Sequence, residues 1–218
     1  MSEVVAGDDG VRVERVVTSG KFELDGGSWD VENNVWLVGD DESVFIVDPG
    51  HESGPILEAV GGRTIAGILC THAHNDHIDA AAGIKAAHPD VRIALHPEEW
   101  PLWEMTYPEL RWDDDLADGE VLSVGGTDIE VMHTPGHSPG ACCLSIPSLG
   151  VVLTGDTLFQ GGPGATGRSF SDYPTIVASI RDRLFALSAE TIVLTGHGDS
   201  TTIGAESPQL QEWLDAAK

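Results

Sequence analysis

Hydrophobic residues recur along the chain in short runs, and the spacing of these runs predicts a mixed α/β structure. Runs of roughly four to eight residues rich in Val, Ile and Leu, bounded by Gly, Pro, Asp or Ser, are typical of strands. By this criterion we predict strands over residues 11–17, 34–38, 43–47, 65–70, 92–96, 120–124, 127–132, 142–146, 150–153 and 191–194.

Two kinds of connection join these predicted strands. Residues 39–42 and the pair Gly125-Gly126 lie between apolar runs and predict hairpins. Alanine-rich or amphipathic stretches lie between other strands and predict crossovers. Because both connections occur in each half, we expect an α/β sandwich rather than one parallel sheet, in a single domain spanning residues 1–218. The predicted helices cover residues 55–60, 78–88, 174–187 and 207–217, and residues 97–116 are predicted to be an irregular aromatic segment.

The charge balance narrows the class of partner. The formal net charge is -25, which argues against a nucleic-acid partner, because phosphates would not be neutralised. It also argues against an anionic membrane surface. No stretch approaches the roughly 20 apolar residues of a membrane span, and the first ten residues lack the pattern of a signal peptide. We expect a cytoplasmic protein that acts on a small molecule, and its oligomeric state stays open.

The three cysteines are Cys70, Cys142 and Cys143. An odd number with two adjacent residues does not suggest a disulfide framework. We expect small buried apolar side chains in strands, with a metal-binding thiol at Cys70 as the alternative.

The densest group of chemically active side chains occupies residues 71–77, Thr-His-Ala-His-Asn-Asp-His. This segment comes directly after a predicted strand and before a predicted helix. In α/β sheets, polar sites form at the carboxyl ends of strands. Three histidines and a carboxylate at a buried strand end are costly without a metal ion. The candidate ligands are His72, His74, Asp76 and His77.

Three further residues, His137, Asp156 and His197, also follow predicted strands and have a glycine directly before them. Glycine permits sharp turns and close approach of the backbone. Seven imidazole and carboxylate ligands exceed the three that a catalytic zinc usually takes. They suit two divalent ions, with zinc first and iron or manganese as alternatives.

These residues resemble the metallo-β-lactamase superfamily, whose pattern is His-x-His-x-Asp-His followed by distant His, Asp and His residues. The resemblance runs from about Asn34 to Glu206 and implies a four-layer αββα sandwich. It also implies that Asp48, in a Val-Asp-Pro-Gly turn, orients a ligand from behind; a plain turn residue is the alternative. It assigns His72, His74 and His137 to one metal, Asp76, His77 and His197 to the other, Asp156 as the bridge, and Asp76 and Asp156 as catalytic carboxylates.

Within the superfamily the chain looks most like compact glyoxalase II-type hydrolases. The supporting segments lie at residues 134–140, 154–158, 167–170 and 194–198. Full-length glyoxalase II enzymes hold glutathione with a basic C-terminal helical extension that this sequence, ending at Lys218, does not contain. The resemblance therefore implies an acyl-thioester substrate but does not assign glutathione as the thiol.

A mechanism follows as a hypothesis. A hydroxide between two metals can attack an acyl carbonyl, and a thiolate of pKa about 8.5 leaves with little need of an acid. Arg168 can bind a substrate carboxylate with two hydrogen bonds; the alternative is that Arg168 is an ordinary surface residue. Phe170 is a second candidate for substrate binding. The aromatic residues Trp100, Trp103, Tyr107 and Trp112 form either a wall over the pocket or a small core under a loop. His51, His88, His96 and His133 fit no ligand position and are interpreted as structural or surface residues.

Three other functions remain open. Persulfide dioxygenases resemble this family and use one iron, which here would be held by His72, His137 and Asp156. Lactone or phosphoester hydrolysis would use the same metal core. A metal-binding scaffold without turnover is the third, although all seven ligand positions are filled.

Overall fold

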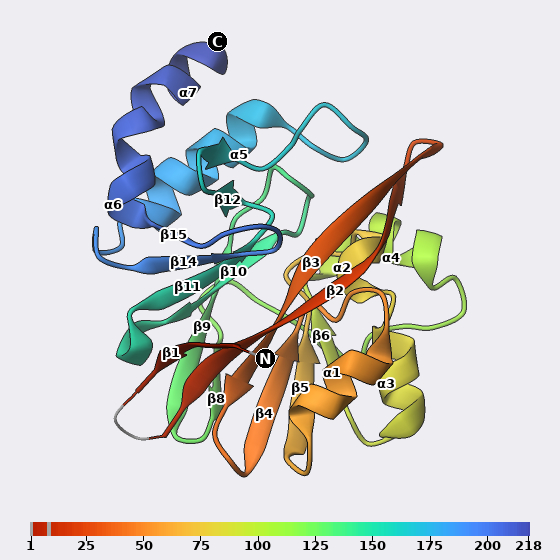
Figure 1. The fold of residues 1–218 in the computed structure, drawn as a ribbon. Helices are drawn as coiled ribbons and strands as arrows, with labels where there is room; N and C mark the ends of the chain where they lie inside the picture. Colours follow the sequence, from red (N-terminus) through yellow and green to blue (C-terminus); the bar gives the residue numbers. More distant parts are fainter. Residues whose placement is uncertain (1, 8–9) are drawn as a thin grey trace.

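The computed structural model describes residues 2–7 and 10–218. Over these residues, two twisted sheets pack face to face and helices cover both outer surfaces (Figure 1). The expected αββα sandwich is therefore confirmed.

The first sheet has the strands in chain order, from β1 to β7. Its first four strands pair antiparallel, and β4 to β7 pair parallel through crossovers. The strands are β1 (Ser2–Ala6), β2 (Arg12–Leu24), β3 (Gly27–Gly39), β4 (Ser43–Val47), β5 (Thr64–Leu69), β6 (Ile93–Leu95) and β7 (Asp114–Asp115).

The second sheet has the order β15-β14-β11-β10-β9-β8. Only β11 and β14 pair parallel among its described strands. The strands are β8 (Val121–Val124), β9 (Thr127–His133), β10 (Cys142–Ile146), β11 (Val151–Gly155), β14 (Ile192–Thr195) and β15 (Thr201–Thr202), with a separate ribbon of β12 (Leu158–Phe159) and β13 (Gly162–Pro163).

Helices close both outer faces. Four helices pack on the first sheet: α1 (Ser53–Val60), α2 (Asn75–Ile78), α3 (Ala81–Ala87) and α4 (Trp100–Thr106). On the second sheet lie α5 (Tyr173–Ser179), which continues into a π-helical turn η3 (Ile180–Leu184), then α6 (Ile203–Glu206) and α7 (Leu210–Ala216). Single 3-10 turns are η1 (Pro97–Glu99), η2 (Pro147–Leu149) and η4 (Ser207–Gln209).

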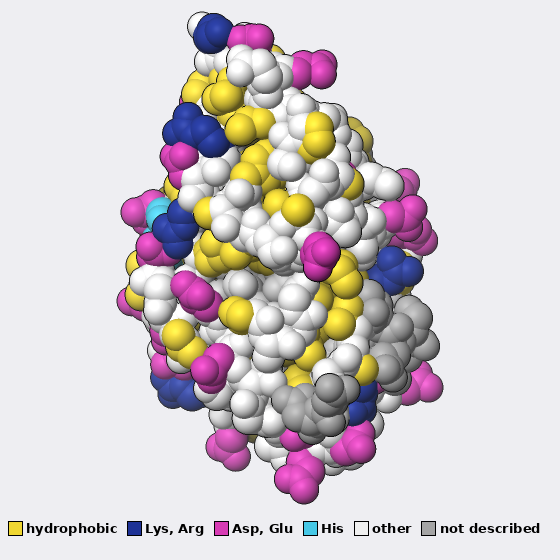
Figure 2. Space-filling model, turned by 90° about the vertical axis from the view of Figure 1, so that its left-hand side faces the viewer, with side chains coloured by type: hydrophobic (Ala, Val, Ile, Leu, Met, Phe, Trp, Pro, Cys, Tyr) yellow, Lys and Arg dark blue, Asp and Glu magenta, His cyan; other side chains and the backbone are white. Residues whose placement is uncertain are grey.

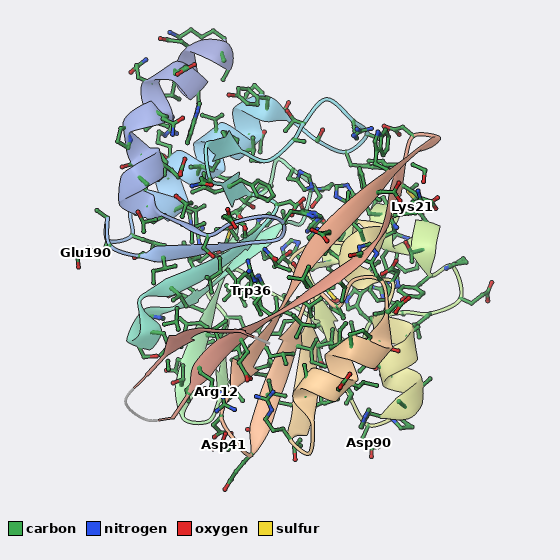
Figure 3. All side chains as sticks on the ribbon, in the orientation of Figure 1. Arg12, Lys21, Trp36, Asp41, Asp90 and Glu190 are labelled. Atoms are coloured by element: carbon green, nitrogen blue, oxygen red, sulfur yellow. The ribbon has the colours of Figure 1, made fainter. Side chains whose placement is uncertain are left out.

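The inner core lies between the sheets. Trp36 is buried there, and its indole N–H donates to the carbonyl of Thr195 at 3.0 Å, which ties the two sheets together (Figure 3). The three cysteines are free thiols buried in the cores, as predicted. Burial raises the pKa of the Cys70 thiol well above its usual range, and no candidate metal cluster among the described residues includes it.

The net charge of -25 is not concentrated in one place on the face drawn in Figure 2. Figure 2 shows acidic side chains scattered over one face rather than gathered in one patch. Within the part of the chain that the structure describes, no helix is long and apolar enough to cross a membrane.

Two predicted elements differ from the structure. The helix predicted over 78–88 begins later, as α3 at Ala81, and a separate short helix, α2, ends at Ile78, because the N–H of Ala80 bonds to the carbonyl of Pro49. The segment predicted to be irregular over 97–116 contains η1 and α4. Both corrections arise from tertiary contacts that override the local pattern.

The strands predicted over 11–17 and 34–38 are the inner parts of a much longer hairpin, β2–β3. Its two strands have 13 residues each and pair through to Leu24 and Gly27. The turn residues Asp25 and Gly26 both have positive φ, 52° and 77°, as a type I′ turn requires. The outer end of this hairpin, which carries Lys21, projects past the sandwich (Figures 1 and 3).

Candidate metal centre

Four chain segments deliver the seven predicted ligands to one edge of the sandwich. The first is the segment after β5, and the others follow β9, β11 and β14. Glycine makes the close approach possible: a Cβ at Gly196 would lie 2.3 Å from Asp156 Oδ1 and 2.7 Å from a ring carbon of His77. The structure thus brings together all seven residues named from the sequence: His72, His74, Asp76, His77, His137, Asp156 and His197.

His72, His74 and His137 form the first group, and all three are buried. Their ring centroids lie 4.7 to 5.0 Å apart. His137 Nε2 is 3.0 Å from His74 Nδ1. Three imidazoles facing one point can hold one divalent ion.

Asp76, His77 and His197 form the second group. His77 Nε2 lies 3.2 Å from His197 Nε2, and His197 Nε2 lies 3.3 Å from Asp76 Oδ2. Ligands about 2.0–2.1 Å from a tetrahedral zinc are roughly 3.3–3.4 Å from one another, so this group also has the dimensions of a metal site.

Asp156 lies between the two groups. Its Oδ2 is 3.6 Å from His137 Nε2 of the first group and 3.4 Å from His197 Nε2 of the second. Its Oδ1 is 3.3 Å from His77 Nε2. One carboxylate therefore reaches both groups.

Several buried polar atoms in this cluster lack the partners that a folded protein normally provides. Among the described side chains, His72 Nε2, Asp76 Oδ1 and Asp156 Oδ1 have no hydrogen-bond partner. Leaving such atoms unsatisfied is expensive. The donor set therefore fits two divalent ions with imidazole and carboxylate preference.

In the protein chain alone, some ligand groups already have their metal-binding form, whereas two histidines are protonated. Burial, then the neighbouring His137, lowers the pKa of His74 to about 3, so the imidazole is neutral at pH 7. Burial raises the pKa of Asp76, but His77 and the hydrogen bonds from His197 and Asn33 outweigh it and lower that pKa to about 2. Neutral imidazole and ionised carboxylate are the forms that bind metal ions. Against the effect of burial, Asp156 and Asp76 raise the pKa of His77 well above its usual range, and Asp156 raises the pKa of His197 to about 10, so metal binding would release these protons.

A set of residues behind the cluster fixes the orientation of its members. Asp48 Oδ2 lies 3.2 Å from His77 Nδ1, and Thr71 donates to both Asp48 oxygens at 2.7 Å. The other ring nitrogens of His137 and His197 lie 2.8 Å from the carbonyl of Ala165 and 2.7 Å from that of Glu32. Such contacts select the tautomer and the ring direction.

Three residues of this outer set were not found from the sequence. Asn33 donates to Asp76 Oδ2 at 3.0 Å, and its own Oδ1 is 2.8 Å from His51 Nε2. His51 therefore helps to orient Asn33, which in turn orients the ligand Asp76. Glu99 is fully buried and accepts from the N–H groups of Ala73 and Gly140, both at 2.7 Å. Their partners lie 18 to 43 positions away along the chain, so no local pattern signals these residues.

A cavity of about 220 Å³ opens onto the cluster. Its apolar side is formed by Phe22, Trp29 and Val31 of the β2–β3 hairpin. Arg168 lines the cavity beside them, whereas Phe170 is exposed and is not among the described residues of the wall. The remaining lining residues are His74, Asp76, His137, Asp156, Ala165, Ser169, Ser171 and His197.

The aromatic segment around α4 does not reach this cavity, so a wall over the pocket is the wrong interpretation for it. Trp103 and Trp112 are buried in the core outside the first sheet, and Trp100 and Tyr107 pack against that core. The structure supports the other interpretation, a small core under a loop. Pocket aromatics come instead from the hairpin tip.

The chain is similar to several known proteins in sequence and in structure. Residues 29–197 match the model of the metallo-beta-lactamase superfamily. A relative from Haemophilus influenzae, named hydroxyacylglutathione hydrolase GloC, is 34% identical over 193 residues, covering 80% of this chain and 90% of the relative. The crystal structure of BLEG-1 B3 metallo-beta-lactamase superposes with a TM-score of 0.73 at 28% identity, covering 86% of this chain and 95% of that one. TTHA1623 in a di-iron-bound form superposes with a TM-score of 0.68 at 30% identity, covering 94% and 96%.

Proposed function

The chain belongs to the metallo-β-lactamase superfamily and is a metal-dependent hydrolase, and from this premise we propose that it cleaves acyl thioesters of a small thiol. The name of the Haemophilus relative, a hydroxyacylglutathione hydrolase, supports the same class of substrate.

The composition of the cavity wall carries the proposal. Of the described residues that line it, every acidic or histidine side chain belongs to the metal cluster, and the rest are apolar residues, serines and Arg168. These described lining residues include no separate carboxylic acid, lysine or tyrosine that could protonate a leaving group. An alkoxide or an amine needs such an acid, whereas a thiolate with a pKa near 8.5 does not.

The cluster residues would hold two divalent cations, His72, His74 and His137 one, Asp76, His77 and His197 the other, with Asp156 between them. Bound cations supply Lewis acidity, which lowers the pKa of water and polarises a carbonyl. Zinc, iron and manganese all suit these donors.

The chain's own residues then position the reaction. Hydrolysis joins a water oxygen to the acyl carbon and breaks the C–S bond, and the thiolate leaves with the electron pair. Asp156 and Asp76 carry the negative charge that faces the reacting water, and Asn33 holds Asp76 in place through its 3.0 Å hydrogen bond. The apolar hairpin wall restricts solvent beside the acyl group.

Metal analysis of the purified protein, combined with a matched panel of substrates, tests the proposal. The panel pairs one acyl group as a thioester with the same acyl group as an oxygen ester and as an amide. We expect about two metal ions per chain and hydrolysis of the thioester at least tenfold faster than that of the others. Failure to cleave any thioester would overturn the proposal.

The same preparation distinguishes the main alternative. One iron per chain and oxygen uptake with glutathione persulfide would indicate a dioxygenase that uses His72, His137 and Asp156. Faster hydrolysis of a lactone or phosphoester than of the thioester would keep the hydrolase and change its substrate.

A further inference from the structure

Two distant segments meet at the mouth of the cavity. One is the tip of the β2–β3 hairpin and the other is the loop of residues 165–171, which leads towards α5 (Figure 1). The N–H of Ser169 donates to Asp25 Oδ2 at 3.0 Å, across 144 positions of sequence. The guanidinium of Arg168 lies 3.9 Å from the ring centre of Trp29 and 5.6 Å from that of Phe22.

The hairpin is also anchored to the metal-binding segment. Asn75, between the ligands His74 and Asp76, accepts from the N–H of Glu23 at 2.8 Å and donates to the carbonyl of Lys21 at 2.7 Å. Both contacts are with β2 just before its turn. The aromatic wall is therefore held at a set position relative to the cluster.

Arg168 is a cation whose hydrogen-bonding capacity is unused. Of the residues described around the cavity, it is the only lysine or arginine. Its guanidinium donates no hydrogen bond and forms no ion pair within the described part of the chain. Stacking occupies the flat face of a guanidinium and leaves its in-plane N–H groups directed outwards, where they can take a carboxylate.

An aromatic path connects this cation with the cluster. Trp29 stacks on Phe22 with ring centres 5.6 Å apart, and the Phe22 ring lies 5.1 Å from the His74 ring. A substrate in this cavity meets metal ligands at one end, apolar rings along one side and a positive charge at the mouth.

We propose that Trp29, Phe22 and Arg168 form a clamp that selects thioesters bearing a carboxylate beside an apolar portion, with Trp29 determining specificity by holding Arg168. This inference rests on the proposed thioesterase function and adds the substrate class. A single carboxylate suits the clamp better than a polyphosphate carrier, because Arg168 is the only lysine or arginine among the residues described around the cavity and the net charge of the protein is -25. The carboxylate can belong to either the thiol or the acyl part.

The test uses two matched pairs of thioesters. The first pair joins a hexanoyl group to 3-mercaptopropionate or to its neutral amide. The second joins a succinyl or a succinamoyl group to one neutral thiol. Within each pair the reactive C–S bond is the same and only the charge differs, so the ratio of kcat/KM reports on the clamp and shows which part carries the recognised carboxylate.

We expect the wild-type protein to prefer the carboxylate in at least one pair by about 10- to 100-fold, mainly through KM, which is the range for a charge-assisted hydrogen-bonded contact. Arg168→Gln and Trp29→Ala are expected to reduce the preference to about threefold or less, while Trp29→Phe retains most of it. Arg111→Gln is the matched control. The guanidinium of Arg111 lies 4.2 Å from the ring centre of Trp112, and neither residue is among those described around the cavity. This variant should keep the full preference.

The outcomes separate the two proposals. If the wild-type protein cleaves no thioester of either pair, the proposed function fails. If it cleaves the charged and neutral members equally in both pairs, the clamp is wrong and the function stands. A preference that survives in both Arg168→Gln and Trp29→Ala, or is lost in Arg111→Gln, also overturns the clamp.

Discussion

Two arginine–tryptophan stacks occupy different settings in this molecule. Arg111 lies 4.2 Å from the ring centre of Trp112, which is 4% exposed and belongs to the core under α4. Arg168 lies 3.9 Å from that of Trp29, which is 38% exposed and lines the cavity. The contact is chemically the same, and what surrounds the tryptophan differs.

The difference separates residues that hold the fold from residues that shape the substrate site. Tryptophans in the outer core bury most of their surface among other side chains, so they contribute mainly to stability. Trp29 faces space that a ligand can fill, so its contribution is expected mainly in binding. The predictions below test this separation, from the largest effect to the smallest.

The largest effect on activity is expected at the metal ligands on the floor of the cavity. Replacing Asp156 by Ala removes the carboxylate that reaches both ligand groups, and we expect hydrolysis to fall by at least about 10³-fold, or ~4 kcal/mol. Steady-state thioester hydrolysis, with metal content measured on the same sample, checks this. Asp199→Ala, which removes an exposed carboxylate two residues beyond His197, should retain activity. Near-normal activity of Asp156→Ala with full metal content would contradict the assignment.

The outer core provides the opposite case. Trp103 is fully buried against Trp112 and Tyr107, and its indole donates to the carbonyl of Leu110 at 2.6 Å. Trp103→Ala is expected to lower the free energy of unfolding by about 3–5 kcal/mol, without changing kcat of the folded fraction. Trp29→Ala should cost under about 1 kcal/mol. Urea unfolding of both variants makes the comparison, and equal losses of stability would remove the distinction between the two regions.

The smallest effect, on the free energy of unfolding, is expected at Glu99, which connects the metal-binding loops with the core under α4. It ends η1 directly before α4 and accepts hydrogen bonds from two ligand-bearing loops. Burial raises its pKa from 4.5 to about 6, against the hydrogen bonds from the N–H groups of Ala73 and Gly140, which lower it. Because the folded state binds this proton more tightly than the unfolded state, its contribution to stability is present below about pH 4.5 and lost as pH rises through 6.

The expected contribution is about 2 kcal/mol. In Glu99→Gln the difference in unfolding free energy from the wild-type protein should therefore change across pH 4.5–6.5. Glu104→Gln, at an exposed position of α4, is the matched control. Urea unfolding at a series of pH values measures both. A constant difference for Glu99→Gln would show that this carboxyl does not titrate in that range.

The sequence was informative where local pattern and chemistry agree. Alternating apolar runs and glycine turns predicted most strands, including the hairpin across Gly125-Gly126, whose residues have φ of 58° and 81°. It was less informative at residues 78–88 and 97–116, where contacts such as Ala80 to Pro49 decide the helix boundaries. A pattern within one segment cannot report a partner in another.

For the candidate site, the sequence alone determined which seven side chains could meet, because each follows a strand and strand ends share one edge of a sheet. It also determined the acidity and the absence of a disulfide framework. Only the tertiary structure decided which aromatics face the cavity, and it chose Phe22 and Trp29 over the richer segment around α4. The physical reason is that the wall depends on how far a long twisted hairpin reaches over another loop, and this distance is set by packing rather than by composition.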